Sequence, residues 1–342
     1  MAETRKPQAF LTIAGQTVTA DEVSAKLSRD GKSDTLSATA ALYGGGPDAD
    51  FWSSANNMDV QCTIDSGAGA SGLVFDGVVD TVECDFSGGK VSITARDKAA
   101  KMIDKKSGKK HLNKQPEQIV QDYAGQSGLP AEVDSVSDKA GRIVQIDYVA
   151  LAHRISDWGM VQHIADTHGM SAYATLGKLY FKKIPEDLPV IDVVFTPPTP
   201  FSMAAGNQMT LVCRRNVGLG KTVNSHVHSW NHKDQKKYEA SATEAGGGDT
   251  LDYHHHHPGL TQDQANKRAK AHLDKTTQHE LNVHVELPGD PTITARFNLQ
   301  LSGTNSAWDQ VHEIDSVEHK ISFVGGYVTS IDTKAKSKRR GG

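Results

Sequence analysis

The sequence has few cysteines and few aromatic residues. Three cysteines, Cys62, Cys84 and Cys213, lie far apart in 342 residues, and aromatic residues make up 6% of the chain. Cysteines this sparse do not form a disulfide framework. Cys62 and Cys84 fall on the apolar face of alternating segments, so we expect them to be buried thiols.

Long apolar runs are also missing. No stretch of about 18 apolar residues occurs, so we expect no membrane span. The first ten residues lack the apolar segment of a signal peptide, and we expect the protein to be used without secretion by its own cell.

The charges are nearly balanced. Lys and Arg number 37 and Asp and Glu number 41, which gives a formal charge of −4. This balance argues against specific nucleic-acid binding and against a membrane-surface protein. The length and the apolar fraction of 37% suit about two to four domains with polar surfaces.

Catalytic motifs of the forms GxSxG, HExxH and CxxC are absent. The sequence GLGKT at 218–222 resembles part of a phosphate loop, but Arg215 stands where the first glycine belongs, and Val223 begins a strand-like pattern. The carboxylates show no spacing typical of an acid–base pair; those considered are Asp97, Asp104, Asp157, Glu313, Asp315 and Glu318. We therefore expect no catalytic residues, no cofactor and no enzyme activity.

Histidines form the one candidate metal motif. His226 and His228 lie on the same face of a predicted strand, and His254–His257 form a run near a predicted loop. Two imidazoles can supply two metal ligands, and a trimer would multiply them. The alternative is a set of polar strand residues and a solvated loop that binds nickel resin without biological meaning. We expect no metal centre and keep His226 and His228 as a candidate pair.

The first hundred residues predict β-structure. Val60, Cys62 and Ile64 alternate with polar residues, and the same period continues over 82–86 and 91–95, with a turn at 87–90. Strands with one apolar and one polar face are typical of an antiparallel barrel or sandwich.

Helices are predicted in the middle of the chain. Pro116 begins one helix. Ser156 and Gly169 are suitable caps for another, which carries Trp158 on its apolar face. A hairpin is predicted after Gly169. This helix and hairpin carry no catalytic or ligand-binding motif, which indicates a packing unit of a scaffold.

Strands return after the Pro-rich segment 193–201, which we interpret as a boundary or a stiff connector. Thr261 and Gln264 form a capping box for an inserted helix. The predicted strands are residues 209–214, 223–230, 281–287 and 293–301, with a final pair of strands over 321–331, and the segment 242–259 is predicted to be loose. Trp230 and Trp308 are expected to be packing or interface anchors.

Four segments in succession carry a family resemblance. They read VSITARDKAAKMIDKK, PEQIVQDYAGQSGLP, ISDWGMVQHIADTHGMSAYATLGKLYF and HEIDSVEHKISFVGGYVTSIDTK. Their order and spacing over about residues 75–333 resemble the late-control protein D family of contractile-tail phages. These are baseplate hub proteins related to the base of type VI secretion spikes. The segment VNSHVHSWNHKD resembles the strand that opens the family's second barrel domain.

The resemblance implies an α+β, mainly β fold with two tube-type antiparallel β-barrel domains, an α/β middle region and an inserted helix. The implied division is a first β-domain at 1–97, a middle domain at 98–192, a second β-domain at 193–333 with a helical insertion about 258–278, and a basic disordered tail at 334–342. The tail could also contact an acidic partner or a charged lumen.

The resemblance further implies a homotrimeric structural hub in the tail baseplate of a virion, assembled in the cytoplasm of the host bacterium. Its ring would match the tail tube on one side and a central spike on the other. Expected partners are the spike protein and the tube or a tube-initiator protein, with the tape measure protein and the baseplate wedge as further candidates. Two features depart from the family: Gln115 is a weak N-cap, and residues 246–258 have no counterpart.

Two alternatives stay open. One is a tail-associated hydrolase of the bacterial cell wall. The other is a hub or spike-base component of a type VI or other phage-like injection system.

Overall fold

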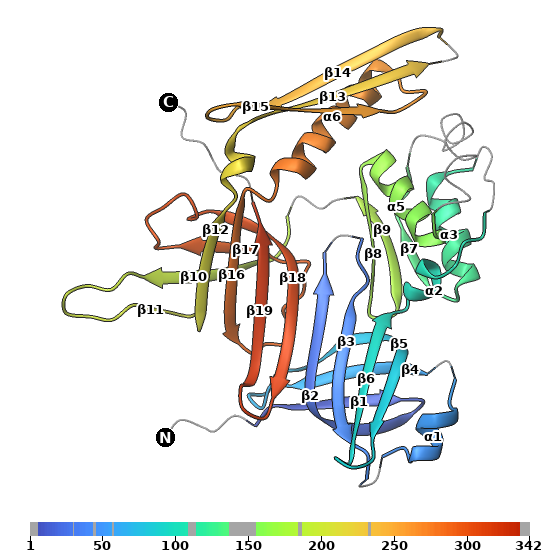
Figure 1. Ribbon diagram of the computed structural model, residues 1–342, viewed down its shortest axis with the longest axis vertical. Coiled ribbons are helices and arrows are strands. Elements are labelled where there is room, and N and C mark those ends of the chain that lie inside the picture. The colour runs from blue at the N-terminus through green and yellow to red at the C-terminus, as the bar shows by residue number, and fades with distance from the viewer. Residues whose placement is uncertain are drawn as a thin grey trace.

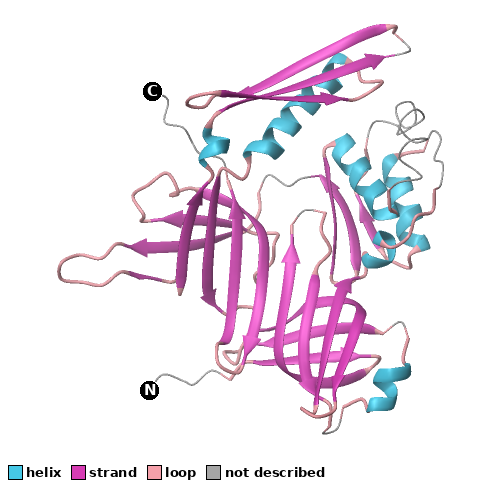
Figure 2. Ribbon diagram, in the orientation of Figure 1, coloured by secondary structure: helices cyan, strands magenta, loops and turns pink. Residues whose placement is uncertain are grey.

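A computed structural model describes residues 6–29, 31–43, 46–56, 58–108, 114–136, 155–183, 187–231 and 234–335. In these residues strands predominate and helices are few, so the expected mainly β, α+β fold is confirmed (Figure 2). The strands form one 13-stranded sheet and two three-stranded sheets. None of the helices in the described ranges combines the length and the apolar character that a membrane crossing requires.

The first β-domain is a closed barrel. Its elements are β1 (Gln8–Ile13), β2 (Gln16–Ser28), β3 (Thr35–Ala41), α1 (Ala49–Ser54), β4 (Asp59–Asp65), β5 (Ser71–Asp85) and β6 (Lys90–Asp97). The strand order is β1-β4-β5-β6-β3-β2, and pairing of β1 with β2 closes it. Cys62 is fully buried as predicted, whereas Cys84 is only half-buried because it lies next to the turn after β5.

The second β-domain is a curled, mainly antiparallel sheet. Its strands are β10 (Val190–Thr196), β11 (Ala205–Gly206), β12 (Thr210–Arg215), β16 (Leu281–Pro288), β17 (Asn298–Ser302), β18 (Val311–Ser322) and β19 (Gly326–Lys334). They follow the order β12-β16-β19-β18-β17-β10-β11. One pair differs from the expected antiparallel barrel, since β10 and β17 run parallel. The predicted strand 293–301 is wrong in its first half: only Asn298 onward is a strand, although Ile293 and Ala295 are still buried.

The two β-domains share one continuous sheet. One edge of β2 pairs first with β1 and then, from Val23 to Ser28, with β18. The matching edge of β18 pairs first with β17 and then with β2. Figure 1 shows the resulting row of strands running from one domain into the other. Neither domain can therefore shift relative to the other without breaking strand hydrogen bonds.

The middle region packs helices on a small sheet. It contains α2 (Ala100–Ile103), α3 (Pro116–Gln126), β7 (Ala131–Val133), α5 (Asp157–His168), β8 (Met170–Thr175) and β9 (Lys178–Lys183), and the sheet order is β7-β9-β8. The predicted caps of α5 are confirmed: Ser156 Oγ accepts a hydrogen bond from the Gly159 N–H, and Gly169 is left-handed with φ 65°. Gln115 makes no side-chain cap on α3, as expected. Trp158 is buried, as predicted.

A separate three-stranded sheet lies beside helix α6 (Gln262–Thr277). Its strands are β13 (Thr222–Asn231), β14 (Lys236–Glu244) and β15 (Thr250–His256), and the 3-10 helix η1 (Val217–Gly220) leads into it. The predicted capping box of Thr261 and Gln264 is confirmed. Two predictions are wrong here. Residues 223–230 join this sheet rather than opening the second barrel, and residues 250–256 form a strand rather than a loose segment.

The basic tail lies outside the described residues beyond Ala335. Lys334, which the sequence assigned to the tail, ends β19 and is buried, with its Nζ 3.6 Å from Asp315 Oδ1.

Candidate assembly surface

A β-hairpin arm projects from the second β-domain (Figure 1). We define the arm as residues 190–209, which comprise β10, β11 and the turn between them. The Pro-rich sequence at 193–201 was interpreted as a connector. It instead forms the second half of β10 and the tip of the arm. The strand ends before the three prolines, because proline lacks the backbone N–H that a strand needs.

The arm is held in shape by its own polar contacts. At the tip, Thr199 and Ser202 exchange backbone hydrogen bonds of 2.9 and 3.2 Å. At the base, Asn207 Nδ2 donates to the carbonyl of Asp192, and the Val194 N–H donates to Asn207 Oδ1. The arm thus keeps its hairpin form although much of it projects from the domain.

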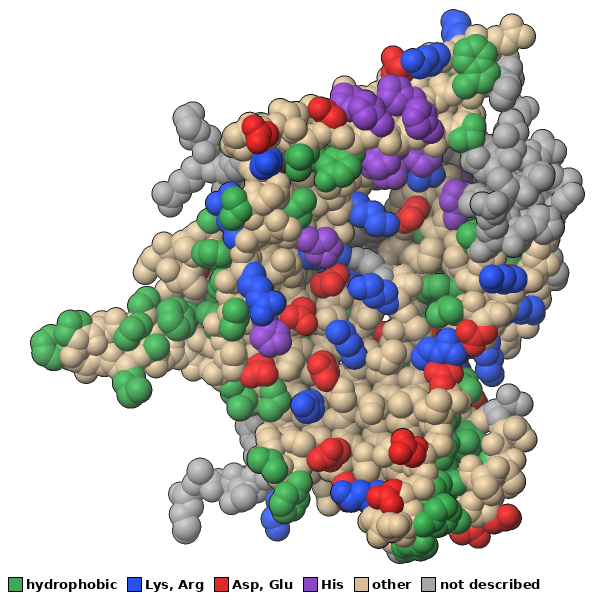
Figure 3. All heavy atoms as spheres, viewed as in Figure 1, with side chains coloured by type: hydrophobic (Ala, Val, Ile, Leu, Met, Phe, Trp, Pro, Cys, Tyr) green, Lys and Arg blue, Asp and Glu red, His purple; other side chains and the backbone are tan. Residues whose placement is uncertain are grey.

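Apolar side chains on the arm face outward. Phe201 is 99% exposed, and Met203 and Met209 are 89% and 60% exposed. Figure 3 shows hydrophobic side chains along the projecting arm. A set of large exposed apolar groups on one rigid element is typical of a protein–protein contact.

Arg296 links all three parts of the chain. It lies in the second β-domain between β16 and β17, and its guanidinium carbon lies 3.3 Å from the centroid of the Tyr173 ring of β8. Its Nη2 also donates a hydrogen bond to the carbonyl of Arg29, which follows β2. Arg29 in return donates from Nη1 to the carbonyl of Phe297 at 3.1 Å.

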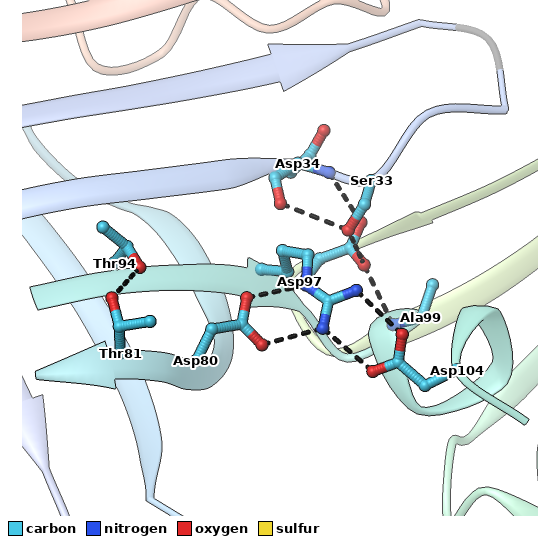
Figure 4. A network of polar contacts seen from close by, with 9 residues as sticks. Ser33, Asp34, Asp80, Thr81, Thr94, Asp97, Ala99 and Asp104 are labelled. Carbon is cyan, nitrogen blue, oxygen red and sulfur yellow. Dashed lines mark hydrogen bonds and ion pairs between the residues drawn. The ribbon is translucent and has the colours of Figure 1, made fainter.

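A second polar junction joins the barrel to α2 (Figure 4). Arg96 on β6 donates to both Asp80 on β5, at 2.6 Å, and Asp104 after α2, at 2.9 Å. These bonds raise the pKa of Arg96 and lower the pKa of Asp104. These ion pairs fix the middle region on the barrel.

Asp34 and Asp97 form a buried carboxylate pair in the same view (Figure 4). Asp97 accepts hydrogen bonds from Ser33 Oγ, from the Asp34 N–H and from the Ala99 N–H, all within 2.9 Å. Burial raises the pKa of Asp97 and raises the pKa of Asp34 to about 8. Sequence reasoning missed Asp34, because its burial depends on how the β2–β3 connection folds over the barrel end.

The other carboxylates considered from the sequence have structural partners. Asp157 accepts from the Ser107 N–H and hydroxyl at 2.8 and 2.7 Å. Glu318 accepts from Ser24 Oγ at 2.6 Å across the β2–β18 ladder. Glu313 and Asp315 lie near the Lys334 ammonium. Each of the six residues thus takes part in an ion pair or a hydrogen bond within the fold, and Glu313 and Asp315 share one lysine.

The structure brings the candidate histidines together. His226 and His228 on β13 are paired in register with His254 and His256 on β15. The last residue of the run, His257, lies on the opposite side of the sheet and has its Nε2 2.8 Å from His272 Nε2 of α6. The sequence did not predict this gathering, since a run of four histidines has no alternation that indicates a strand.

The tryptophans divide into core and surface. Trp308 packs against the core of the second β-domain, whereas Trp230 is 49% exposed on β13. Trp158 Nε1 donates to the carbonyl of Gly31 at 2.8 Å and so ties α5 to the barrel.

The GLGKT sequence forms η1 and the start of β13, which is not the strand-loop-helix arrangement of a phosphate loop.

Solved structures share this fold. A tail protein from Neisseria meningitidis aligns with a TM-score of 0.71 and 13% identity over 96% of each chain. The 43 kDa tail protein of prophage MuSo2 from Shewanella oneidensis aligns with a TM-score of 0.66 and 14% identity, over 95% of this chain and 97% of that one. At these identities, the likeness establishes the fold.

A third neighbour comes from a secretion system. It is an E. coli component of the type VI secretion system, described as structurally similar to the T4 bacteriophage tail proteins gp27 and gp5. It aligns with a TM-score of 0.59 and 9% identity, over 97% of this chain and 78% of that one. A comparison with curated protein sequences gives no match. Residues 60–322 match the family model of the Alg8 N-terminal domain, and because this match covers more than half of the chain, the protein belongs to that family.

Proposed function

We propose that the protein is a structural subunit of a contractile phage tail, in which three copies form the baseplate hub between the tail tube and the central spike. The observation that carries the proposal is the continuous sheet through β2 and β18, which fixes two β-domains side by side in one chain. Three such chains place six β-domains in a ring, which suits a six-fold tube on one face and a three-fold spike on the other.

The arm supplies the contact between subunits in this proposal. Its exposed Phe201 and Met203 would be buried against the neighbouring copy in the ring. The fold shared with tail proteins supports a tail role. A solved structure of the Francisella PdpA–VgrG complex also shares the fold, which supports a spike-type partner; this chain spans 53% of the length of that neighbour. The specific late-control protein D family stays a prediction.

The remaining expectations belong to the same proposal. The spike and the tube or its initiator are the direct partners, with the tape measure protein and the baseplate wedge nearby. The hub lies in the virion and has no enzymatic role. The structural uses of the carboxylates described above support this, and a zymogram on bacterial cell walls tests it: a cleared zone that tracks with the pure protein would overturn the non-enzymatic role.

Light scattering of the purified protein, alone and mixed with its candidate spike protein, tests the assembly. We expect the mass of a trimer in at least one condition. The double variant Phe201→Ser, Met203→Ser should lower the trimer fraction by 10-fold or more, whereas Leu176→Ser, at an exposed turn of the middle region, should leave it unchanged. A monomer in both conditions would refute the trimeric hub.

A further inference from the structure

Four histidines form a zigzag row of stacked rings on the open face of the three-stranded sheet, in the order His226, His254, His228 and His256. His226 and His254 are register partners, as are His228 and His256. Adjacent rings stack, with centroids 4.9 Å apart for His226 and His254 and 5.3 Å apart for His228 and His256. Figure 3 shows the histidine side chains gathered on this upper face.

Two carboxylates lie beside this array, with Asp252 Oδ1 3.3 Å from His226 Nε2 and Glu239 Oε1 2.8 Å from His228 Nδ1, but the rings also face one another. Like charges directly opposite on neighbouring strands repel, so protonated rings at these positions would oppose one another. The face is also open, because α6 covers the other side of this sheet, where Val227 and Ala269 are buried together. A ligand that binds neutral imidazoles would therefore stabilise this face.

Two of the ring nitrogens have the spacing of metal ligands. His228 Nε2 lies 3.2 Å from His254 Nδ1. Two nitrogens that each lie about 2.0–2.1 Å from a tetrahedral zinc ion are separated by about 3.3–3.4 Å, which is close to the observed spacing. The two rings stack, with centroids 5.5 Å apart and planes 15° apart, so both rings must turn before one ion can lie in the plane of each.

A carboxylate orients the first of these rings. His228 Nδ1 lies 2.8 Å from Glu239 Oε1 of β14, so this nitrogen holds its proton and donates it to Glu239. The lone pair of the neutral ring is then on Nε2, which faces His254. A carboxylate on the distal nitrogen is the arrangement that fixes the tautomer of metal-binding histidines.

We propose that this face binds a divalent first-row transition metal ion, with His228 Nε2 and His254 Nδ1 as the first two ligands. Within the described residues, no three His, Cys, Asp or Glu side chains are already placed to hold a metal ion. The third ligand therefore comes from a side-chain rotation of His226 or His256, and water completes the shell. This proposal departs from the sequence-based expectation of no metal centre, and it is independent of the hub assembly.

Metal binding would connect β15 to β13. β15 is an edge strand held by one parallel ladder, and the Gly-rich residues 246–248 precede it. An ion held by His228 and His254 adds a link across this ladder. We therefore expect slower amide hydrogen exchange in β15 when metal is bound.

Calorimetric titration of the full chain with Zn²⁺, and separately with Ni²⁺, tests the site. We expect one ion per chain at pH 7.5, weaker binding at pH 5.5 because protons compete for the imidazoles, and protection of β15 amides on zinc addition. The variants His228→Asn and His254→Asn should each weaken binding 10-fold or more, and Glu239→Gln should weaken it about 10-fold.

The control is His284→Asn, which removes a carboxylate-paired histidine of the second β-domain and should leave the affinity unchanged. Three results would overturn the proposal: no zinc binding at millimolar concentration, binding that persists within two-fold in His228→Asn, or binding that is lost instead in His257→Asn on the opposite side of the sheet.

Discussion

Leu27 on β2 lies in the core of the second β-domain, and Ile321 on β18 lies in the core of the first. Each residue is contributed by the strand of the other domain, because β2 and β18 are paired over this stretch. The two cores are therefore not independent. A substitution at either residue should therefore affect the packing of both β-domains.

Leu27→Ala should destabilise the protein by about 2–5 kcal/mol, since it removes a buried leucine side chain and leaves a cavity. We expect the two β-domains to unfold in one transition in the wild type and in two resolved transitions in the variant. Urea unfolding followed by tryptophan fluorescence and circular dichroism measures this.

Phe86→Ala, at a 60% exposed position after β5, is the control for that experiment and should change stability by less than about 1 kcal/mol. Equal midpoints for Leu27→Ala and Phe86→Ala would contradict the shared core.

Arg296→Ala should loosen the middle region from both β-domains. The variant loses the stack on Tyr173 and the hydrogen bond to the Arg29 carbonyl, which together contribute about 1–3 kcal/mol. Hydrogen exchange of β8 should become faster. Arg296→Lys keeps the charge but not the planar guanidinium, so it should give an intermediate rate. If β8 exchanges at the same rate in all three proteins, Arg296 does not link the domains.

Asp34 should make the protein less stable at alkaline pH. Burial raises its pKa from 3.8 to about 8, so the folded chain holds a proton that the unfolded chain has already released. Stability contributed by this proton is complete below about pH 4 and is lost as the pH rises to about 8. Asp97 acts in the same direction, since its pKa is also raised.

Asp34→Asn should flatten this slope, because the amide oxygen can still accept from the Ser28 N–H, which lies 2.7 Å from the present carboxylate. Melting temperatures from pH 5 to 9 measure the effect, with Asp21→Asn on the exposed part of β2 as the matched control. A wild-type slope in Asp34→Asn would show that another group is responsible.

His257 and His272 should make the protein less stable at acidic pH. The pKa of each is lowered from 6.5 to about 4, mainly by burial and to a smaller extent by Arg268 and the neighbouring histidines, while Asp166 opposes this at His272. The unfolded chain takes up protons first, so stability is full above about pH 6.5 and is lost as the pH falls toward 4.

Hydrogen exchange of α6 measured between pH 7 and 4, corrected for the intrinsic rates, should show this loss. The double variant His257→Asn, His272→Asn should remove the pH dependence, and His284→Asn should preserve it. An α6 that is equally protected at pH 7 and pH 4.5 in the wild type would rule out this role for the pair.

Local signals in the sequence predicted local structure well. The caps Ser156 and Gly169 defined α5, and Thr261 with Gln264 defined the start of α6, because a cap depends on residues within one helical turn. The alternation around Cys62 likewise predicted a barrel strand, since one face of that strand is buried within its own domain.

Features that depend on distant partners could not be predicted. The pairing of β2 with β18 joins residues such as Ser24 and Glu318, and periodicity does not identify a partner strand. Residues 193–201 were interpreted as a connector because they are Pro-rich, and the apolar residues at the tip of the arm stay exposed, so no buried face sets a pattern there. The histidine array needed the register of β13 against β15, which appears only in the folded sheet.

The β2–β18 ladder also has a consequence during synthesis. Ser24 and Glu318 are 294 positions apart, so a ribosome adding about 5–20 residues per second needs roughly 15–60 s to deliver the strand that pairs with Val23–Ser28. Over that interval, the β2 edge and Leu27 are without their final partners, and an open edge recruits any strand nearby. The barrel made first is therefore the part of the nascent chain most in need of a chaperone, and slowing translation should increase aggregation through this edge.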